Sequence, residues 1–290
     1  MKLDGRRESG NVDDRRRMSG GAKAGMGIGG IILIAIITFL SGGNLGDVIQ
    51  NVGTQMITGG GVEEQTDREF TQEEEELAAF SKKVLASTED VWTQVFKENG
   101  LGEYRAPTMV LYTGAVQTAC GQGNAQVGPF YCSADEKLYI DLSFFTSMKR
   151  QLGADGDFAY AYVIAHEVGH HVQHLLKTLD KAHAQMQRMN KVDQNKLSVR
   201  IELQADFYAG VWGHYEQKMF GSLEDGDLQE AIQCAHQIGD NYLQEKAQGR
   251  SVPESFTHGT SAQRMKWLKL GLQTGDLRQG DTFSKSESQL

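Results

Sequence analysis

The sequence is short of prolines and has no surplus of basic residues. It holds three prolines among 290 residues, which excludes extended proline-rich linkers. Its net charge of −9 argues against a nucleic-acid partner, and we expect none. Hydrophobic residues make up 39% of the chain, which is enough for a folded core. The length predicts one domain of about 200 residues with an additional segment, or two smaller domains.

Charged residues are absent from one stretch near the N-terminus, between Ala24 and Gly46. Its apolar centre covers residues 28–40, and the whole stretch can span a bilayer core, which needs about 20 helical residues. Residues 1–25 carry seven Lys/Arg and four Asp/Glu, a net charge of +3, so the positive-inside rule would keep them in the cytoplasm. A cleaved signal peptide and a buried core helix are the alternatives to a membrane anchor.

The chain is therefore expected to have five segments. They are a basic cytoplasmic leader (1–25), a transmembrane signal anchor (26–45), a linker (46–70), the main domain (71–278) and a flexible tail (279–290). Everything after the anchor would lie outside the cytoplasm, where disulfides persist. Cys120 and Cys132 are the favoured pair, because a glycine-rich segment between them can form a hairpin or a tight loop, and Cys234 would remain as a small buried hydrophobe.

Hydrophobic periodicity predicts an α+β fold that is mostly helical with a small antiparallel sheet. A first helix begins near Thr71, which forms a capping box with Glu74. Two strands follow at residues 108–112 and 137–142, and the antiparallel arrangement is expected because no helix of adequate length separates them. The remaining helices are predicted at residues 157–178, 194–219, 225–247 and 259–274. The second strand, from Leu138 to Leu142, is a candidate edge for an extended peptide.

The chemistry centres on the run His166-Glu-Val-Gly-His170, which lies in a predicted helix. A spacing of four residues places His166 and His170 on one helical face, one turn apart, so both imidazoles can bind one metal ion. Glu167 leaves the helix beside that ion and suits a general base for a water molecule. Zinc is the expected metal, one ion per chain, because it takes imidazole and carboxylate ligands in catalytic sites. A histidine-rich, solvent-facing helix is the alternative.

A catalytic zinc ion needs a third protein ligand. One large class of zinc peptidases continues the motif with glycine and histidine, but Gln173 and Leu176 occupy those positions here. Glu202 is the candidate from a later helix, and Asp206 lies one turn further, where it could accept a hydrogen bond from a ligating histidine. The alternative for Glu202 is an exposed helical charge. Weaker competitors as ligands are His174, His183 and His214.

These motifs resemble the gluzincin pattern, in which a glutamate on a second helix completes the metal site. More narrowly, the chain resembles the predicted neutral zinc metallopeptidase family of bacteria. The matching stretches are Thr118–Gly121, Gly128–Cys132, Tyr139–Phe145, Ala165–Gln173, Glu202–Trp212 and Thr257–Arg264. The resemblance implies a zincin-like metallopeptidase domain, and members of the family carry a basic leader and one membrane anchor.

His258 and Arg264 are candidate site residues only because of the family resemblance. In related membrane zinc peptidases, a late histidine followed six residues on by arginine lies near the scissile carbonyl. His258 could therefore donate a hydrogen bond to the developing oxyanion, and Arg264 could orient His258 or bind a substrate carbonyl. The alternative for His258 is a loop histidine that caps a helix.

Taken together, the sequence predicts a membrane-anchored zinc peptidase of a bacterial cell membrane, crossing once, with its catalytic domain in the periplasm or outside the cell. Its substrate would be a peptide or an unfolded protein. A catalytically silent, zinc-stabilised binding or scaffold protein is the alternative from another class, although such a protein would not need Glu167. The third candidate function is that of a zinc hydrolase that acts on non-peptide amides. Oligomeric state stays open.

Overall fold

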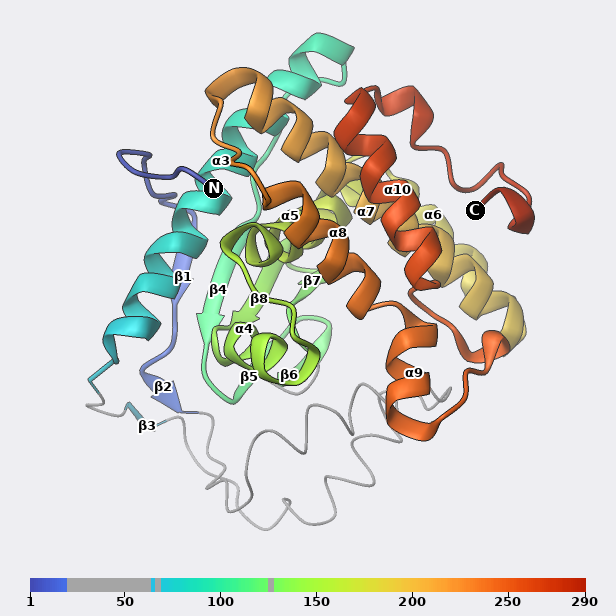
Figure 1. Cartoon of the computed structure of the whole chain (residues 1–290), viewed down its shortest axis with the longest axis horizontal. Helices are drawn as coiled ribbons and strands as arrows, with labels where there is room; N and C mark the ends of the chain where they lie inside the picture. The colour runs from blue at the N-terminus through green and yellow to red at the C-terminus, as the bar shows by residue number, and fades with distance from the viewer. Residues whose placement is uncertain (20–63, 66–68, 125–127) are drawn as a thin grey trace.

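The structure is a computed structural model that describes residues 1–19, 64–65, 69–124 and 128–290 (Figure 1). Its main sheet has the strand order β1-β4-β8-β7, formed by Val12–Asp14, Thr108–Tyr112, Lys137–Asp141 and Phe130–Cys132. Strand β4 is parallel to β1 and to β8, whereas β7 is antiparallel to β8. Two small antiparallel pairs complete the strands, β2 (Met18–Ser19) with β3 (Glu64–Gln65) and β5 (Ala115–Thr118) with β6 (Gly121–Asn124).

The prediction of an antiparallel sheet was wrong, because the sheet is mixed. The two strands expected at residues 108–112 and 137–142 exist, but they run parallel, with Val110 opposite Tyr139. A parallel pair needs a crossover connection, and here the β5–β6 hairpin and β7 supply it instead of a helix. Strand β8 is paired on both sides and is therefore not the free edge expected for a peptide. Among the described strands, β1 and β7 form the edges of this sheet.

The sheet and the long helices share one hydrophobic core. The helices and helical turns are α3 (Gln72–Asn99), α4 (Ser143–Ser147), η1 (Met148–Leu152), α5 (Asp157–Leu175), α6 (Thr178–Met186), α7 (Lys191–Phe220), α8 (Asp227–Gln237), α9 (Asp240–Gln248), η2 (Pro253–Ser255), α10 (Ser261–Thr274), η3 (Leu277–Gln279) and η4 (Glu287–Gln289). The predicted capping box of Thr71 and Glu74 starts α3. Within the core, α7 packs against both α5 and α10.

The helix predicted at residues 225–247 is in fact two helices, α8 and α9, which are separated at Gly239. A Cβ atom at Gly239 would lie 2.4 Å from the backbone nitrogen of Ser261, so glycine is required for this close approach. The break turns the chain so that Asp240, the first residue of α9, can contact the loop before α10. That contact matters for His258, as described below.

The predicted transmembrane helix is not supported either. In residues 1–19, 64–65, 69–124 and 128–290, no helix combines the length and the apolar character needed to cross a membrane. The predicted span, residues 26–45, lies outside these described residues. The fold class is therefore corrected to a mostly helical protein with a small mixed sheet.

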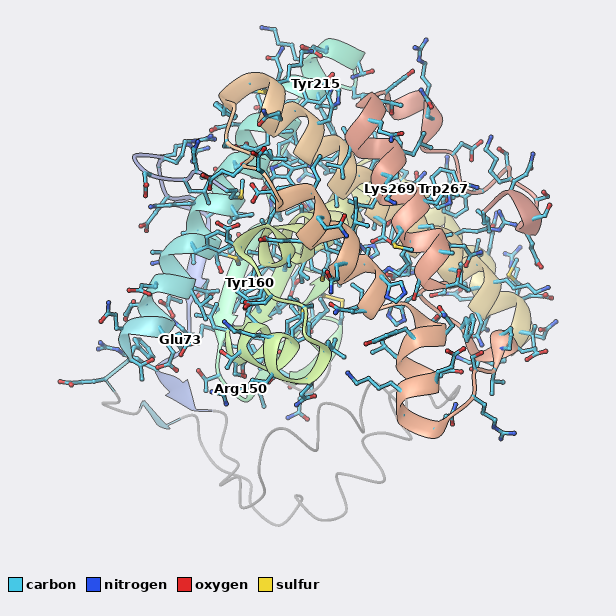
Figure 2. The ribbon with its side chains drawn as sticks, in the orientation of Figure 1. Glu73, Arg150, Tyr160, Tyr215, Trp267 and Lys269 are labelled. Carbon is cyan, nitrogen blue, oxygen red and sulfur yellow. A yellow bond between two sulfur atoms is a disulfide. The ribbon has the colours of Figure 1, made fainter. Side chains whose placement is uncertain are left out.

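Both ends of the chain contact the domain in ways that the sequence did not suggest. At the N-terminal end, β1 adds a strand beside β4, and the Arg6 guanidinium donates to the buried Glu216 carboxylate at 2.9 Å. At the other end, Arg200 on α7 donates to the backbone carbonyls of Thr282 and Lys285. Trp267, labelled on α10 in Figure 2, donates from its indole nitrogen to the carbonyl of residue 290. Residues in the segment 279–290 thus contact α7 and α10.

The predicted disulfide between Cys120 and Cys132 is present. It joins the β5–β6 hairpin region to the end of β7, an edge strand of the sheet. Cys234 is free and buried, as expected, with its thiol against the sulfur of Met148.

Candidate metal centre and active site

Helix α5 carries the His-Glu-Val-Gly-His run and lies in the middle of the core. Its own residues between Phe158 and Gln173 are buried on nearly all faces of the helix. This is the pattern of a helix that is enclosed by other elements. Helix α7 crosses it closely. A Cβ atom at Gly169 would lie 2.9 Å from the carbonyl oxygen of Ala205, so the glycine inside the motif and the small Ala205 together permit this approach. The crossing brings Glu202 and Asp206 on α7 to the histidines of α5.

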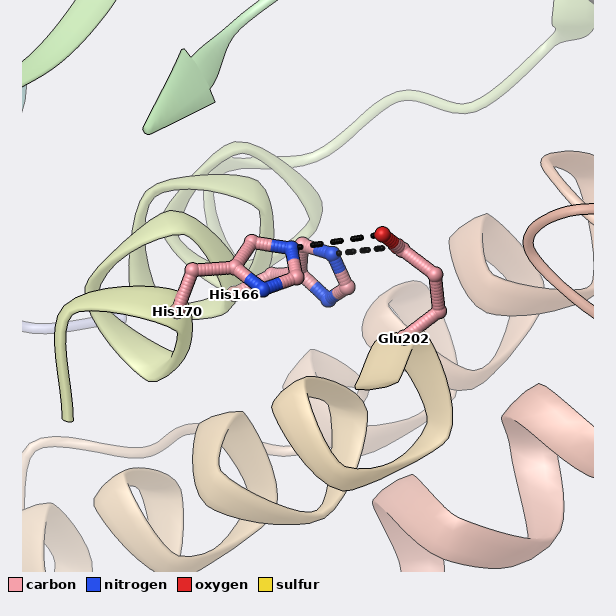
Figure 3. A group of neighbouring side chains, drawn as sticks. All are labelled: His166, His170 and Glu202. Carbon is pink, nitrogen blue, oxygen red and sulfur yellow. Dashed lines mark hydrogen bonds and ion pairs between the residues drawn. The ribbon is translucent and has the colours of Figure 1, made fainter. Parts of the chain in front are cut away.

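Three side chains converge as the sequence predicted. His166, His170 and Glu202 offer donor atoms that all lie within 4.8 Å of one another (Figure 3). Nε2 of His166 is 3.1 Å from one Glu202 carboxylate oxygen, and Nε2 of His170 is 3.5 Å from the other. Two imidazole nitrogens and one carboxylate oxygen are the donor set of a catalytic zinc site. The residues present therefore fit a zinc ion.

Asp206 contacts the His166 imidazole at Nδ1, the ring nitrogen that does not face Glu202. Its carboxylate lies 2.8 Å from Nδ1 of His166 and also accepts from the Tyr162 hydroxyl at 2.6 Å. Burial, the largest single influence, would raise the pKa of Asp206, but the charges and hydrogen bonds of Arg264 and His166 together outweigh burial and lower this pKa to about 2. An ionised carboxylate only accepts hydrogen bonds, so Nδ1 of His166 carries the hydrogen and Nε2 is left to bind a metal ion.

The pKa values of the two imidazoles shift in opposite directions. Burial would lower the pKa of this imidazole, but the neighbouring Asp206 and Glu202 carboxylates raise it to about 10. Burial lowers the pKa of His170 to about 4, so the second ring stays neutral at pH 7. Metal binding would therefore compete with protonation of His166.

Glu167 directly follows His166 on α5, interacts electrostatically with His166 and Glu202, and is almost completely buried. Burial, the largest influence, raises the pKa of its carboxyl group to about 7. A group that titrates near the working pH can both accept and donate a proton, which is what a general acid–base catalyst must do.

His258 is positioned by Asp240. One Asp240 oxygen accepts the backbone amides of Thr257, His258 and Gly259 at 2.7–2.9 Å, and the other lies 3.2 Å from Nδ1 of His258. The His258 side chain is 32% exposed, so it can meet a substrate from solvent. Burial would lower its pKa, but the charges of Asp240 and then Glu202 raise it, which places His258 within electrostatic reach of the metal ligands.

Arg264 lies behind Asp206 instead of facing solvent. The residue is 3% exposed, and its Nε and Nη2 donate to the two Asp206 oxygens at 2.8 and 2.9 Å. Its guanidinium also donates to the Tyr162 hydroxyl and to the Ile238 carbonyl, both at 3.3 Å. This geometry supports a role in holding Asp206, whereas the resemblance suggested that Arg264 orients His258 or binds a substrate carbonyl.

Replacing Arg264 by methionine should lower the free energy of unfolding by about 3–5 kcal/mol, because the buried Asp206 carboxylate would lose its cation. The measurement is urea unfolding of the metal-free protein. Arg200→Met is the matched control, because Arg200 donates only to partly exposed carbonyls, and we expect a loss of about 1 kcal/mol. Equal losses in the two variants would contradict the structural role of Arg264.

The other histidines considered as ligands lie elsewhere. Nδ1 of His174 is 2.8 Å from Asp180, and Nδ1 of His214 is 3.0 Å from the Leu272 carbonyl. His183 is not part of the donor group around His166. The sequence reading missed Tyr162 and Asp240. Tyr162 stands one helical turn before His166, which is a usable signal, whereas Asp240 precedes His258 by eighteen residues and has no local signature.

An enclosed helix with two histidines one turn apart, joined by a carboxylate from a crossing helix, is the arrangement typical of the zinc-metallopeptidase class. The family model described as "Putative neutral zinc metallopeptidase" matches residues 1–283. The chain belongs to this family. It is 49% identical to the uncharacterized protein YpfJ of Escherichia coli strain K12 over 294 residues, covering 99% of this chain and all of YpfJ.

A second relative is the uncharacterized protein Rv2575 of Mycobacterium tuberculosis strain H37Rv. It is 42% identical over 211 residues, which cover 69% of each chain. No solved structure matches the chain.

Proposed function

We propose that this protein is a zinc-dependent peptidase that hydrolyses peptide bonds in peptides or unfolded proteins. The observation that carries the proposal is the buried position of Glu167 on α5, directly after His166 in the converging group of His166, His170 and Glu202, where burial raises the pKa of its carboxyl group to about 7. Within the described residues this donor group has three members, whereas structural zinc sites are closed by four protein ligands. A silent, zinc-stabilised scaffold is therefore the weaker candidate.

In the proposed reaction, different residues of the chain have different roles. Zinc, when bound, supplies the Lewis acidity that brings the pKa of water to about 7 and polarises a carbonyl oxygen. The Glu167 carboxylate accepts the proton of the attacking water and then delivers it to the leaving amine. His258, with Nδ1 held by Asp240, can donate from Nε2 to the oxygen that becomes negatively charged. Asp206 and Arg264 keep the His166 imidazole in place.

We also propose that the metallopeptidase domain works outside the cytoplasm. The Cys120–Cys132 disulfide supports this placement, because such bonds persist in oxidising compartments and are rare in the cytosol.

Removing the metal tests the function directly. The purified full-length protein should hold one zinc ion per chain and cleave an unfolded protein substrate. Chelation should lower the cleavage rate by at least about 100-fold, because the Lewis acid is lost, and added zinc should restore the rate. Calcium is the control and should not restore it, because calcium prefers six to eight oxygen ligands.

The outcomes separate the competing functions. Bound zinc without cleavage of any peptide would support the silent scaffold. Cleavage of small amides but not of peptides would support the amide hydrolase. Cleavage that survives complete metal removal would contradict every zinc mechanism.

A further inference from the structure

The second metal-binding histidine, His170, has a partner of its own that differs from the carboxylate behind His166. Nδ1 of His170 lies 2.9 Å from Oε1 of Gln173, three residues further along α5. The Gln173 side chain is completely buried. In the sequence, Gln173 was informative only because it occupies a position where another peptidase class has glycine.

The Gln173 amide nitrogen is committed to two acceptors on α7. It donates to the Ile201 carbonyl at 2.8 Å and to Oε1 of Gln204 at 3.1 Å. Gln204 is also buried, and its own amide nitrogen donates to the Gly280 carbonyl at 2.8 Å. A continuous set of hydrogen bonds thus connects a metal ligand on α5, through α7, to the chain after α10.

The direction of these hydrogen bonds is fixed by the two backbone carbonyls. A carbonyl oxygen can only accept, so the NH₂ group of Gln173 must face Ile201 and that of Gln204 must face Gly280. A flipped Gln173 amide would place its oxygen against the Ile201 carbonyl and leave a buried acceptor unpaired, at a cost of about 1–3 kcal/mol. Oε1 of Gln173 therefore faces His170 and accepts a hydrogen from Nδ1.

The consequence for the imidazole is a defined tautomer. With the hydrogen on Nδ1, the lone pair of His170 is on Nε2, the atom that faces Glu202. A neutral amide suits this position better than a carboxylate. A carboxylate at residue 173 would direct a second oxygen at the Ile201 carbonyl, and it would add a negative charge to a buried site that already contains Glu202 and Asp206.

We propose that Gln173 and Gln204 are positioning residues for the metal centre, a buried amide relay that sets the tautomer of His170 and anchors it to the Gly280 carbonyl. The proposal rests on the zinc site of the proposed function and goes beyond it, because it assigns roles to two residues that contact neither metal nor substrate. Gln204 acts only through Gln173, so the two contributions are coupled.

Zinc affinity tests the relay without any measurement of catalysis. In the full-length protein, Gln173→Met should weaken zinc binding by about 10- to 100-fold in a chelator competition assay, which is the usual effect of removing the partner of a ligating histidine. Gln204→Met should weaken it by less. The double variant should bind zinc about as well as Gln173→Met alone, because coupled residues are not additive.

A tautomer measurement and a control variant complete the test. Nitrogen-15 NMR of the histidines in the metal-free protein should show His170 with hydrogen on Nδ1, and Gln173→Met should shift it toward a mixture of tautomers. Asn195→Leu is the matched control, since Asn195 is a buried amide on α7 that donates to the Glu254 carbonyl, outside the relay. Its zinc affinity should equal that of the wild type, whatever its stability.

Different experimental outcomes would overturn the proposed relay and the proposed zinc site. A wild-type chain that binds no zinc would overturn the proposed function and the relay together. Wild-type zinc affinity in Gln173→Met, or fully additive losses in the double variant, would overturn the relay alone. If metal-free Gln173→Met does not fold, Gln204→Met decides the question, and unchanged affinity and an unchanged His170 tautomer in that variant would overturn the relay.

Discussion

Replacing Glu167 by glutamine is expected to lower kcat for peptide hydrolysis by about 10²- to 10⁴-fold while zinc remains bound. Glutamine has nearly the same shape as glutamate, so α5 and the donor group of His166, His170 and Glu202 should keep their geometry. An amide cannot take a proton from water at neutral pH, however, so the proton transfer is lost. The measurement compares kcat, KM and zinc content of the variant with those of the wild type.

Two further results make the Glu167 experiment decisive. Glu245→Gln removes a glutamate at an exposed position of α9 and should leave kcat unchanged. If Glu167→Gln cleaves substrate as fast as the wild type, Glu167 is not the base and the proposed mechanism fails. If the variant loses zinc as well as activity, its loss of activity reports on the metal site instead of on proton transfer.

Replacing Glu202 by alanine is expected to remove zinc from the protein. Glu202 supplies the one carboxylate oxygen of the three-membered donor group, and only two imidazoles would remain. The loss of affinity should exceed the roughly 10- to 100-fold effect that follows removal of a residue behind a ligand. The measurement is zinc content after dialysis, together with a chelator competition assay.

Asp193→Ala is the matched control for Glu202, because Asp193 is an exposed acidic residue in the first turn of the same helix. Its zinc content should match the wild type. Full zinc retention in Glu202→Ala would remove Glu202 from the site and would require another ligand.

The parts of the site that follow from local spacing could be predicted from sequence. His166 and His170 share a face because four residues make about one helical turn, and the same rule places Glu202 and Asp206 together. The convergence of α5 and α7 was inferable only because two histidines and a general base demand a third ligand. The small residues at Gly169 and Ala205, where the helices meet, agree with that inference.

The parts that depend on distant partners could not be predicted in the same way. The spacing between His258 and Arg264 suggested that they act together. In the structure, Arg264 donates hydrogen bonds to Asp206, whereas the His258 imidazole contacts Asp240. A buried charge is placed by the partner that neutralises it, and that partner has no fixed separation in sequence. Only the folded chain shows which carboxylate meets which cation.

The strand arrangement of the sheet was predicted wrongly for a related reason. Parallel pairing of β4 with β8 was rejected because a parallel connection usually contains a helix, whereas here a hairpin and an edge strand make the crossover. The N-terminal strand β1 was missed because Val12–Asp14 is short and mostly charged, without the alternation that marks a strand.

The pairing of β2 with β3 has a practical consequence for protein engineering. Ser19 lies directly opposite Glu64 in an antiparallel register. Two strands in that register can be joined by a two-residue turn such as Asn-Gly. A shortened protein in which such a turn replaces residues 20–63 would preserve the connectivity of β1, the sheet and the metal centre.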